Sequence, residues 1–223
     1  ETGMAIMDIV RKGLKPRDIM TLDAFRNAIS VDMAFGGSSN TALHLPAIAH
    51  EAGIELPLAL FDSISEKVPH ICNMSPAGPH HLEDLNEAGG VYAIMKELSR
   101  RNLIKRSCLT VSGRKVSDIL RNADATDRDV IRTIENAYHE KGGLAVLTGS
   151  LAPQGSIVKR IGVSENIWHF EGKARVFASE EDAGKAIMEG RIGAGDAVII
   201  RYEGPKGGPG MREMLTPTSI LAG

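Results

Sequence analysis

The sequence predicts a mixed α/β protein, with a mainly helical first part and a small β-rich second part of the barrel or sandwich type. Apolar residues recur at helical spacing up to about residue 106. After Gly142-Gly143 they gather instead into short segments bounded by turn residues. The 223 residues, 43% of them hydrophobic, suffice for the cores of one large or two modest domains. We therefore expect two domain parts, residues 1–140 and 141–223.

The first helices are indicated by an apolar stripe and by end signals. The stripe over residues 4–14 predicts a helix that Gly13 and Pro16 end. Thr21 is suited to cap the next helix, because its hydroxyl can accept a hydrogen bond from a first-turn N–H. Apolar residues within 24–29 would form the buried side of that helix.

Two further helices follow glycine pairs. The serines after Gly36-Gly37 can cap a helix that runs toward His50. Pro46 lacks an N–H, so we expect a kink or a shortened first turn there. After Gly89-Gly90, the apolar positions within 91–98 predict another amphipathic helix.

From residue 108 onward the predicted elements become short. Residues 108–111 are expected to form a strand, Ser112-Gly113 a turn and residues 115–120 a helix. The charged stretch 122–139 is interpreted as a linker or a surface helix. Later, Ser179 and three acidic residues indicate the start of a helix over 179–188. The predicted strands of the second part are 144–147, 156–158, 167–170, 174–177 and 197–202.

Composition excludes several classes of function. The net charge of −2 gives no general attraction to nucleic acid or to an anionic membrane, and 4% aromatic residues argue against base stacking. No apolar run is long enough to span a bilayer. Two cysteines are too few for a disulfide framework, so we expect a cytoplasmic protein.

A glycine- and proline-rich stretch is the most conspicuous candidate for a binding site. Four glycines and two prolines lie within residues 204–210, after an apolar strand and before the charged pair Arg212-Glu213. Such a backbone can approach a ligand closely, and its N–H groups can converge on an anion. A flexible connector is the alternative, but the preceding strand and the charged pair favour a site.

The second candidate is Cys72, within the irregular stretch 68–81. Its prolines and Gly78 indicate that the thiol need not be buried. Together with His70, His80 and His81 it could supply zinc ligands, but the spacing does not match paired-ligand hairpins. A lone cysteine is more often a small buried hydrophobic residue, and Cys108 fits that interpretation well. The residues alone do not decide between these roles for Cys72.

Several motifs together resemble the dihydroxy-acid dehydratase family, which includes phosphogluconate and sugar-acid dehydratases. The cysteine stretch favours the valine and isoleucine branch. The matching blocks are Lys15-Pro-Arg-Asp-Ile-Met-Thr21, Gly36-Gly-Ser-Ser-Asn-Thr41, the Cys72 stretch with Glu83-Asp84-Leu85 and Ala88-Gly-Gly90, Thr148-Gly-Ser-Leu-Ala-Pro153, and Gly204 through Ser219.

The resemblance implies a hydro-lyase that converts a 2,3-dihydroxy acid to a 2-keto acid in branched-chain amino-acid biosynthesis. It implies an iron–sulfur cluster (2Fe-2S or 4Fe-4S) and Mg, in an α/β cluster-binding domain over 1–140 and a swivelling β-barrel domain over 141–223. Cys72 matches a cluster-ligating cysteine and Glu213 a magnesium-ligating glutamate, so both should face one cleft. The resemblance also implies that the full-length enzyme forms a homodimer.

By the same resemblance, the chain corresponds to a central-to-C-terminal fragment. The other cluster cysteines, the other magnesium ligands and the serine base match no residue here, and Ser219 belongs to a different block. We therefore name no catalytic residue and expect the isolated chain to be inactive. The alternatives are a fragment of a sugar-acid or phosphogluconate dehydratase, and a non-catalytic module that binds a small anion.

Overall fold

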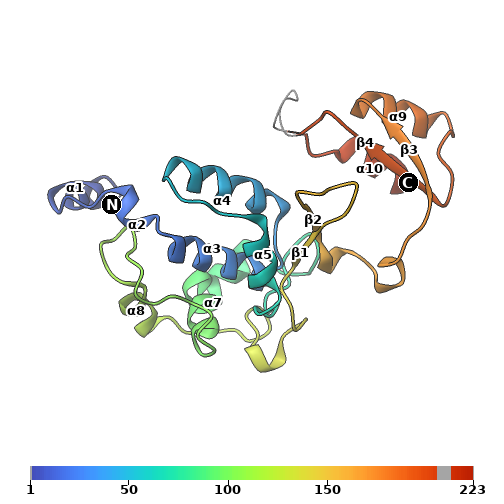
Figure 1. Ribbon diagram of the computed structural model, residues 1–223. Helices are drawn as coiled ribbons and strands as arrows, with labels where there is room; N and C mark the ends of the chain where they lie inside the picture. The colour runs from blue at the N-terminus through green and yellow to red at the C-terminus, as the bar shows by residue number, and fades with distance from the viewer. Residues whose placement is uncertain (1, 205–211, 223) are drawn as a thin grey trace. The chain divides into compact units, whose positions relative to one another are not determined.

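The computed structural model describes residues 2–204 and 212–222 (Figure 1). The chain divides into two compact units, Glu1–Ser164 and Glu165–Gly223. The mixed α/β class is confirmed, and the described residues form two small two-stranded sheets but no closed barrel. The domain boundary expected after residue 140 concerns the parent protein and stays a prediction. No helix in the described part of the chain is long and apolar enough to cross a membrane.

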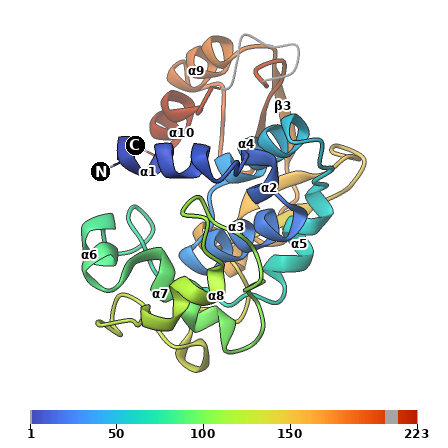
Figure 2. The same cartoon turned by 90° about the vertical axis from the view of Figure 1, so that its left-hand side faces the viewer.

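Helices make up most of the first unit. They are α1 (Thr2–Arg11), α2 (Pro16–Ile19), α3 (Leu22–Phe35), α4 (Ser39–Glu51), α5 (Leu58–Ser65), α6 (Leu82–Glu87), α7 (Gly90–Ser99) and α8 (Val116–Ile119). Helix α3 is central, because α4, α5 and α7 all pack against it (Figure 1). Its buried face carries Phe25, Ile29 and Met33. In the view of Figure 2, α6 lies beside α7, against which it packs.

A small antiparallel sheet completes this unit. It consists of β1 (Leu144–Leu147) and β2 (Ser156–Lys159), with Leu144 opposite Lys159. Strand β1 packs on α5, and the Val146 N–H donates to the Asp62 carboxylate at 3.0 Å. Single turns of 3-10 helix lie at Leu120–Asn122, Ile134–Asn136 and Arg160–Gly162.

The second unit is a βαβ arrangement. Strands β3 (Lys173–Phe177) and β4 (Asp196–Ile200) are parallel and are joined by α9 (Glu180–Met188). Helix α10 (Leu215–Ala222) packs against α9. A 3-10 turn over Glu165–Ile167 opens this unit. Residues 205–211 of the glycine- and proline-rich stretch lie outside the described residues.

The predicted helix starts at Thr21 and Ser179 are confirmed. The Ala24 N–H donates to the Thr21 hydroxyl at 3.2 Å, and the Asp182 N–H donates to the Ser179 hydroxyl at 3.1 Å. Ser38 occupies the N-cap position of α4, but its side chain makes no capping hydrogen bond. Helix α4 also continues through Pro46, so a shortened helix there is wrong, and the alternative of a kink stays a prediction.

Three other local expectations are corrected. Residues 108–111 form one side of a tight turn, in which Thr110 pairs with Arg114 and Leu109 makes only an isolated antiparallel bridge with Lys115. Residues 167–170 form no strand: Ile167 ends a 3-10 turn, and Phe170 is exposed. The stretch 122–139 is neither a linker nor a surface helix, because Ile131 and its neighbours Val130 and Ile134 are buried. Strands and buried loops both depend on distant partners, which local patterns do not reveal.

The junction between α3 and α4 contains a carboxylate with a shifted pKa. Asp32 accepts hydrogen bonds from the Ser38 N–H at 3.2 Å and the Thr41 hydroxyl at 3.0 Å, through the same oxygen. Burial nevertheless raises the pKa of Asp32 from 3.8 to about 6, against the lowering effects of Thr41, Ser38 and Lys159. The folded state therefore favours the protonated carboxyl.

This shift predicts a pH-dependent loss of stability that Asp32→Asn should remove. Because the folded pKa is the higher one, the stabilisation is fully present below pH 4 and is lost as the pH rises through 6. The wild type should lose up to about 3 kcal/mol relative to Asp32→Asn across this window. Urea unfolding of both proteins at pH 4 and pH 7 measures the difference, in which other titrating groups cancel. Parallel pH profiles for the two proteins would contradict the prediction.

Candidate functional site

The two predicted ligands belong to different units. Cys72 lies in the first unit, and Glu213 lies in the second, two residues before α10. Each is therefore described within its own unit, and the expectation that both face one cleft stays a prediction.

Cys72 lies in an extended stretch, residues 68–72, between α3 and the segment 132–139. The N–H groups of Ile71 and Cys72 both donate to the Ala34 carbonyl, at 2.9 and 3.0 Å. That carbonyl is one of the last four of α3, which have no acceptor role within the helix. On the other side, the Arg132 N–H donates to the Ile71 carbonyl at 3.0 Å. The backbone of the cysteine is thus fixed from two sides.

A pair of histidines holds the same stretch. His70 Nε2 lies 2.7 Å from the Cys72 carbonyl oxygen, and His70 Nδ1 lies 2.9 Å from His139 Nδ1. Burial lowers the pKa of His70 to about 4, so the ring is neutral near pH 7. A carbonyl only accepts, so Nε2 must carry the proton and Nδ1 must accept one from His139. The backbone pairs as well, with the His70 N–H donating to the His139 carbonyl at 3.0 Å.

The Cys72 thiol is fully buried, a point that the residues alone had left open. The prolines and glycine do make the stretch irregular, but the hydrogen bonds to Ala34 and His139 bring it into the core. Burial raises the pKa of the Cys72 thiol to about 12, so the metal-free thiol is protonated at neutral pH.

Four glycines make this arrangement possible. The turn Gly36-Gly37 at the end of α3 meets the turn Gly142-Gly143 before β1. A Cβ on Gly143 would overlap the Gly36 carbonyl, one on Gly142 would lie 2.6 Å from the Met33 Cβ, and one on Gly37 would lie 2.6 Å from the Leu144 Cγ. The Gly143 N–H donates to the Met33 carbonyl at 3.2 Å, one residue before Ala34.

The structure does not assemble the four zinc-ligand candidates of the stretch 68–81. His70 uses Nε2 on a backbone carbonyl. His81 is the N-cap residue of α6, and its N–H donates to the Asp84 carboxylate at 2.7 Å. Within the described residues, no group of three or more His, Cys, Asp or Glu side chains is placed to hold a metal ion. Cys72 therefore contributes a single donor in its unit.

Glu213 presents an exposed carboxylate in the second unit. No other described residue bonds to that carboxylate. Its neighbour Arg212 is, by contrast, surrounded by carboxylates. Its guanidinium lies 2.8 Å from Glu180, 2.8 Å from Glu181 and 3.3 Å from Glu203. Sequence spacing gave no signal for these partners, which lie 9 to 32 residues earlier in the chain.

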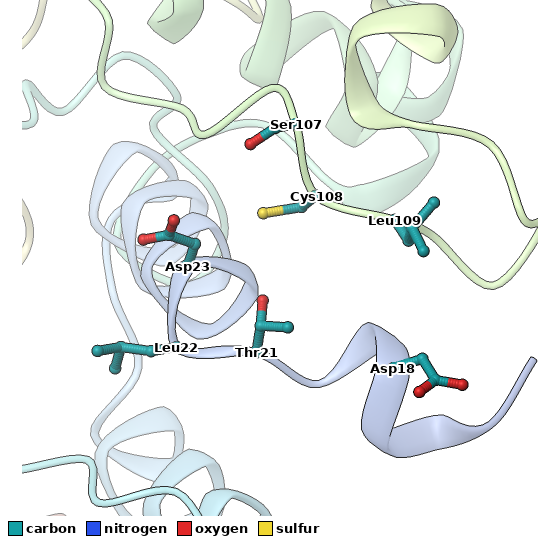
Figure 3. Close-up of a pocket in the computed structure, with 7 residues that line it drawn as sticks. All are labelled: Asp18, Thr21, Leu22, Asp23, Ser107, Cys108 and Leu109. Carbon is teal, nitrogen blue, oxygen red and sulfur yellow. The ribbon is translucent and has the colours of Figure 1, made fainter.

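Cys108 lies apart from the cysteine stretch, in an open pocket of about 500 Å³ (Figure 3). Its sulfur is directed toward the start of α3, near Thr21 and Asp23 (Figure 3). Burial, together with the nearby Asp23 carboxylate, raises the pKa of the Cys108 thiol. The residue is 8% exposed, in keeping with the sequence interpretation as a small buried side chain. The other residues that line this pocket are Asp18, Leu22, Ser107 and Leu109.

Comparison with known proteins decides the family. Residues 1–119 match the model of the dihydroxy-acid/6-phosphogluconate dehydratase N-terminal domain, and residues 129–223 match that of the C-terminal domain. The chain belongs to the dihydroxy-acid/6-phosphogluconate dehydratase family. The resemblance deduced from the motifs is thereby confirmed.

Curated members of this dehydratase family match along the whole chain. Proteins named dihydroxy-acid dehydratase are 56% identical in Desulfatibacillum aliphaticivorans and 58% identical in Desulfosudis oleivorans, each over 100% of this chain. The dehydratase of Lachnospira eligens is 58% identical over 99% of this chain. The chain spans 40% of the length of each of these relatives.

The donors present fit the groups that the dehydratase family implies, one ligand for each. A thiolate such as that of Cys72 is the donor that iron–sulfur clusters take, and a carboxylate such as that of Glu213 is a hard oxygen donor suited to Mg²⁺. Neither residue has the further donors beside it, among the described residues, that a complete site requires.

Proposed function

We propose that the protein containing this chain is a hydro-lyase, which removes water from a 2,3-dihydroxy carboxylic acid to give a 2-keto acid. The observation that carries the proposal is the 54–58% identity, along the whole chain, to relatives named dihydroxy-acid dehydratase. The alternative phosphogluconate activity finds support only in the broader description of the family models. The biosynthetic pathway of branched-chain amino acids, a cytoplasmic location and a homodimer are parts of the same proposal.

In this proposal Cys72 is one of the thiolates that bind an iron–sulfur cluster. Its backbone is held by the Ala34 carbonyl and by the His70–His139 pair, so the direction of the side chain is fixed before any ligand binds. The sulfur is buried and therefore shielded from water, and a low local dielectric constant strengthens its electrostatic interaction with a charged ligand.

Glu213 is the proposed ligand of Mg²⁺. Its carboxylate makes no ion pair with any described residue and is exposed, so it can turn to a cation without breaking an existing bond. When bound, the iron and the magnesium would supply Lewis acidity for loss of hydroxide and for the developing enolate charge. One thiolate and one carboxylate do not complete these sites, so we expect the isolated chain to be inactive.

Replacing Cys72 by Ser in the whole enzyme tests the proposal. A serine hydroxyl is a poor substitute for a thiolate, so the variant should lose the visible absorbance of the cluster and at least a hundredfold of its turnover. Turnover is measured with a branched 2,3-dihydroxy acid and, in parallel, with 6-phosphogluconate. Preference for the latter would select the alternative activity.

Cys108→Ser is the matched control. The two cysteines are both buried in the first unit, but Cys108 lies apart from the Cys72 stretch and lines the pocket of Figure 3. This variant should retain the cluster and the turnover. Full turnover in Cys72→Ser would remove Cys72 from the site, and equal losses in both variants would indicate a general effect on folding.

A further inference from the structure

A charged cluster in the second unit joins three segments of chain. Arg212 directs all three nitrogens of its guanidinium at carboxylates: Nε to Glu180, Nη2 to Glu181 and Nη1 to Glu203. Glu180 and Glu181 open α9, whereas Glu203 follows β4. One side chain therefore links the start of a helix, the end of a strand and the segment before α10.

Glu203 is the buried member of this cluster, with 8% of its side chain exposed. Its Oε1 accepts the Glu180 N–H at 3.0 Å, which satisfies a first-turn donor of α9. The same oxygen accepts a hydrogen bond from Arg212 at 3.3 Å. Its Oε2 is buried and has no hydrogen-bond partner within the described residues. Arg212 is therefore important for keeping the Glu203 carboxylate charged in its buried position, because an unpaired buried charge is costly in free energy.

The positions of Glu203 and Arg212 in the sequence connect this cluster with Glu213. Glu203 immediately precedes residues 204–211 and Arg212 immediately follows them. Their ion pair therefore joins the two ends of that segment. Glu213, the proposed magnesium ligand, is the next residue, and α10 begins at Leu215 and packs on α9. Glu213 thus lies between two points that are both attached to α9.

The same contacts argue against a direct role of Arg212 in binding the substrate. Three carboxylates already surround its guanidinium, so an anionic substrate would have to displace at least one of them. A planar guanidinium holds several acceptors at once in fixed directions, which the single ammonium of lysine does not do. The arrangement suits a residue that fixes its neighbours.

We propose that Arg212 is a positioning residue, which together with Glu203 fixes the backbone of Glu213 relative to α9 so that its carboxylate is placed for Mg²⁺. This inference rests on the proposed function, since it takes Glu213 as the magnesium ligand. Residues that orient metal ligands typically account for 10- to 100-fold in metal affinity.

The test uses the whole enzyme with Arg212→Ala and Arg212→Lys. The first readout is the Mg²⁺ dissociation constant, measured by titration calorimetry. The second is amide hydrogen exchange of residues 212–218 without Mg²⁺, which reports the anchoring independently of turnover. Arg212→Ala should raise the dissociation constant at least tenfold and accelerate exchange. Arg212→Lys should give an intermediate result, and it keeps the test valid if the alanine variant does not fold.

Arg191→Ala is the matched control, because Arg191 pairs with Glu189 just after α9 at 2.8 Å and is exposed. It should change neither readout. Glu213→Gln separates the two proposals. If it weakens Mg²⁺ binding while both Arg212 variants bind normally, the positioning role is overturned and the proposed function stands. If Glu213→Gln binds Mg²⁺ normally, the ligand assignment fails, and the positioning role fails with it.

Discussion

Replacing Gly143 by Ala should destabilise the chain by more than about 3 kcal/mol, an effect at the upper end for a single substitution. The added Cβ would overlap the Gly36 carbonyl carbon and oxygen, which are backbone atoms and cannot move aside as a side chain can. Relief would require the turn before β1 to separate from the end of α3. That movement would break the Gly143–Met33 hydrogen bond of 3.2 Å.

Urea unfolding of the chain measures this effect, with Gly149→Ala as the control. Gly149 lies in the same unit, and a Cβ there would meet nothing within 4 Å. The control should stay within about 0.5 kcal/mol of the wild type, as surface substitutions usually do. Similar small losses for both variants would show that the two glycine turns do not need their close approach.

The destabilisation expected for Gly143→Ala should also affect Cys72, because the C-terminal end of α3 accepts hydrogen bonds from both the glycine turn and the cysteine stretch. The Met33 carbonyl accepts from Gly143, and the Ala34 carbonyl accepts from Ile71 and Cys72. The terminal carbonyls of α3 are thus satisfied by two segments that lie far apart in sequence. Because Met33 and Ala34 are neighbours in α3, a displacement of the glycine turns should also displace the backbone that holds the cysteine stretch.

The sequence predicts those elements whose causes are local. Thr21 and Ser179 cap their helices because the capping hydroxyl and the N–H that it accepts are three residues apart. The helix after Gly89-Gly90 follows from its own apolar spacing, and it forms as α7. The strands β1 to β4 were also predicted from their short apolar segments, at 144–147, 156–158, 174–177 and 197–202, but their pairing was not.

The sequence patterns failed for segments whose local structure depends on residues far away in the chain. Residues 167–170 have strand composition, but Ile167 ends a 3-10 turn and the residues after it lie in no described strand. The burial of Cys72 depends on Ala34, 38 positions earlier, and on the segment that contains His139. His70 and His139 are 69 positions apart, and no spacing pattern connects them. Family motifs led to the proposal of Cys72 and Glu213 as ligands, but they gave no signal for the residues that contact these segments.

The segment 122–139 was also predicted wrongly because it is held by a distant residue, Glu97. Its charges suggested a solvated linker, yet one carboxylate of α7 attaches it to the core. Glu97, which is 3% exposed, accepts hydrogen bonds from Arg128 at 3.0 Å and from the Ile134 N–H at 3.2 Å. It also pairs with Arg100 on its own helix at 2.9 Å. One charge of the segment, Arg128, is thus half exposed and pairs with the buried carboxylate of Glu97.

Glu97→Ala should therefore cost about 3 kcal/mol of unfolding free energy, because it leaves a buried N–H without an acceptor and removes two charge-assisted bonds. Glu135→Ala is the control, since Glu135 pairs with the same Arg100 at 3.7 Å but is 57% exposed. An exposed pair of this kind contributes little to stability, because water screens the two charges. Urea unfolding of the two variants compares a buried and an exposed carboxylate on one arginine. Equal losses would mean that burial of Glu97 adds nothing, and that the segment 122–139 is held by its apolar residues alone.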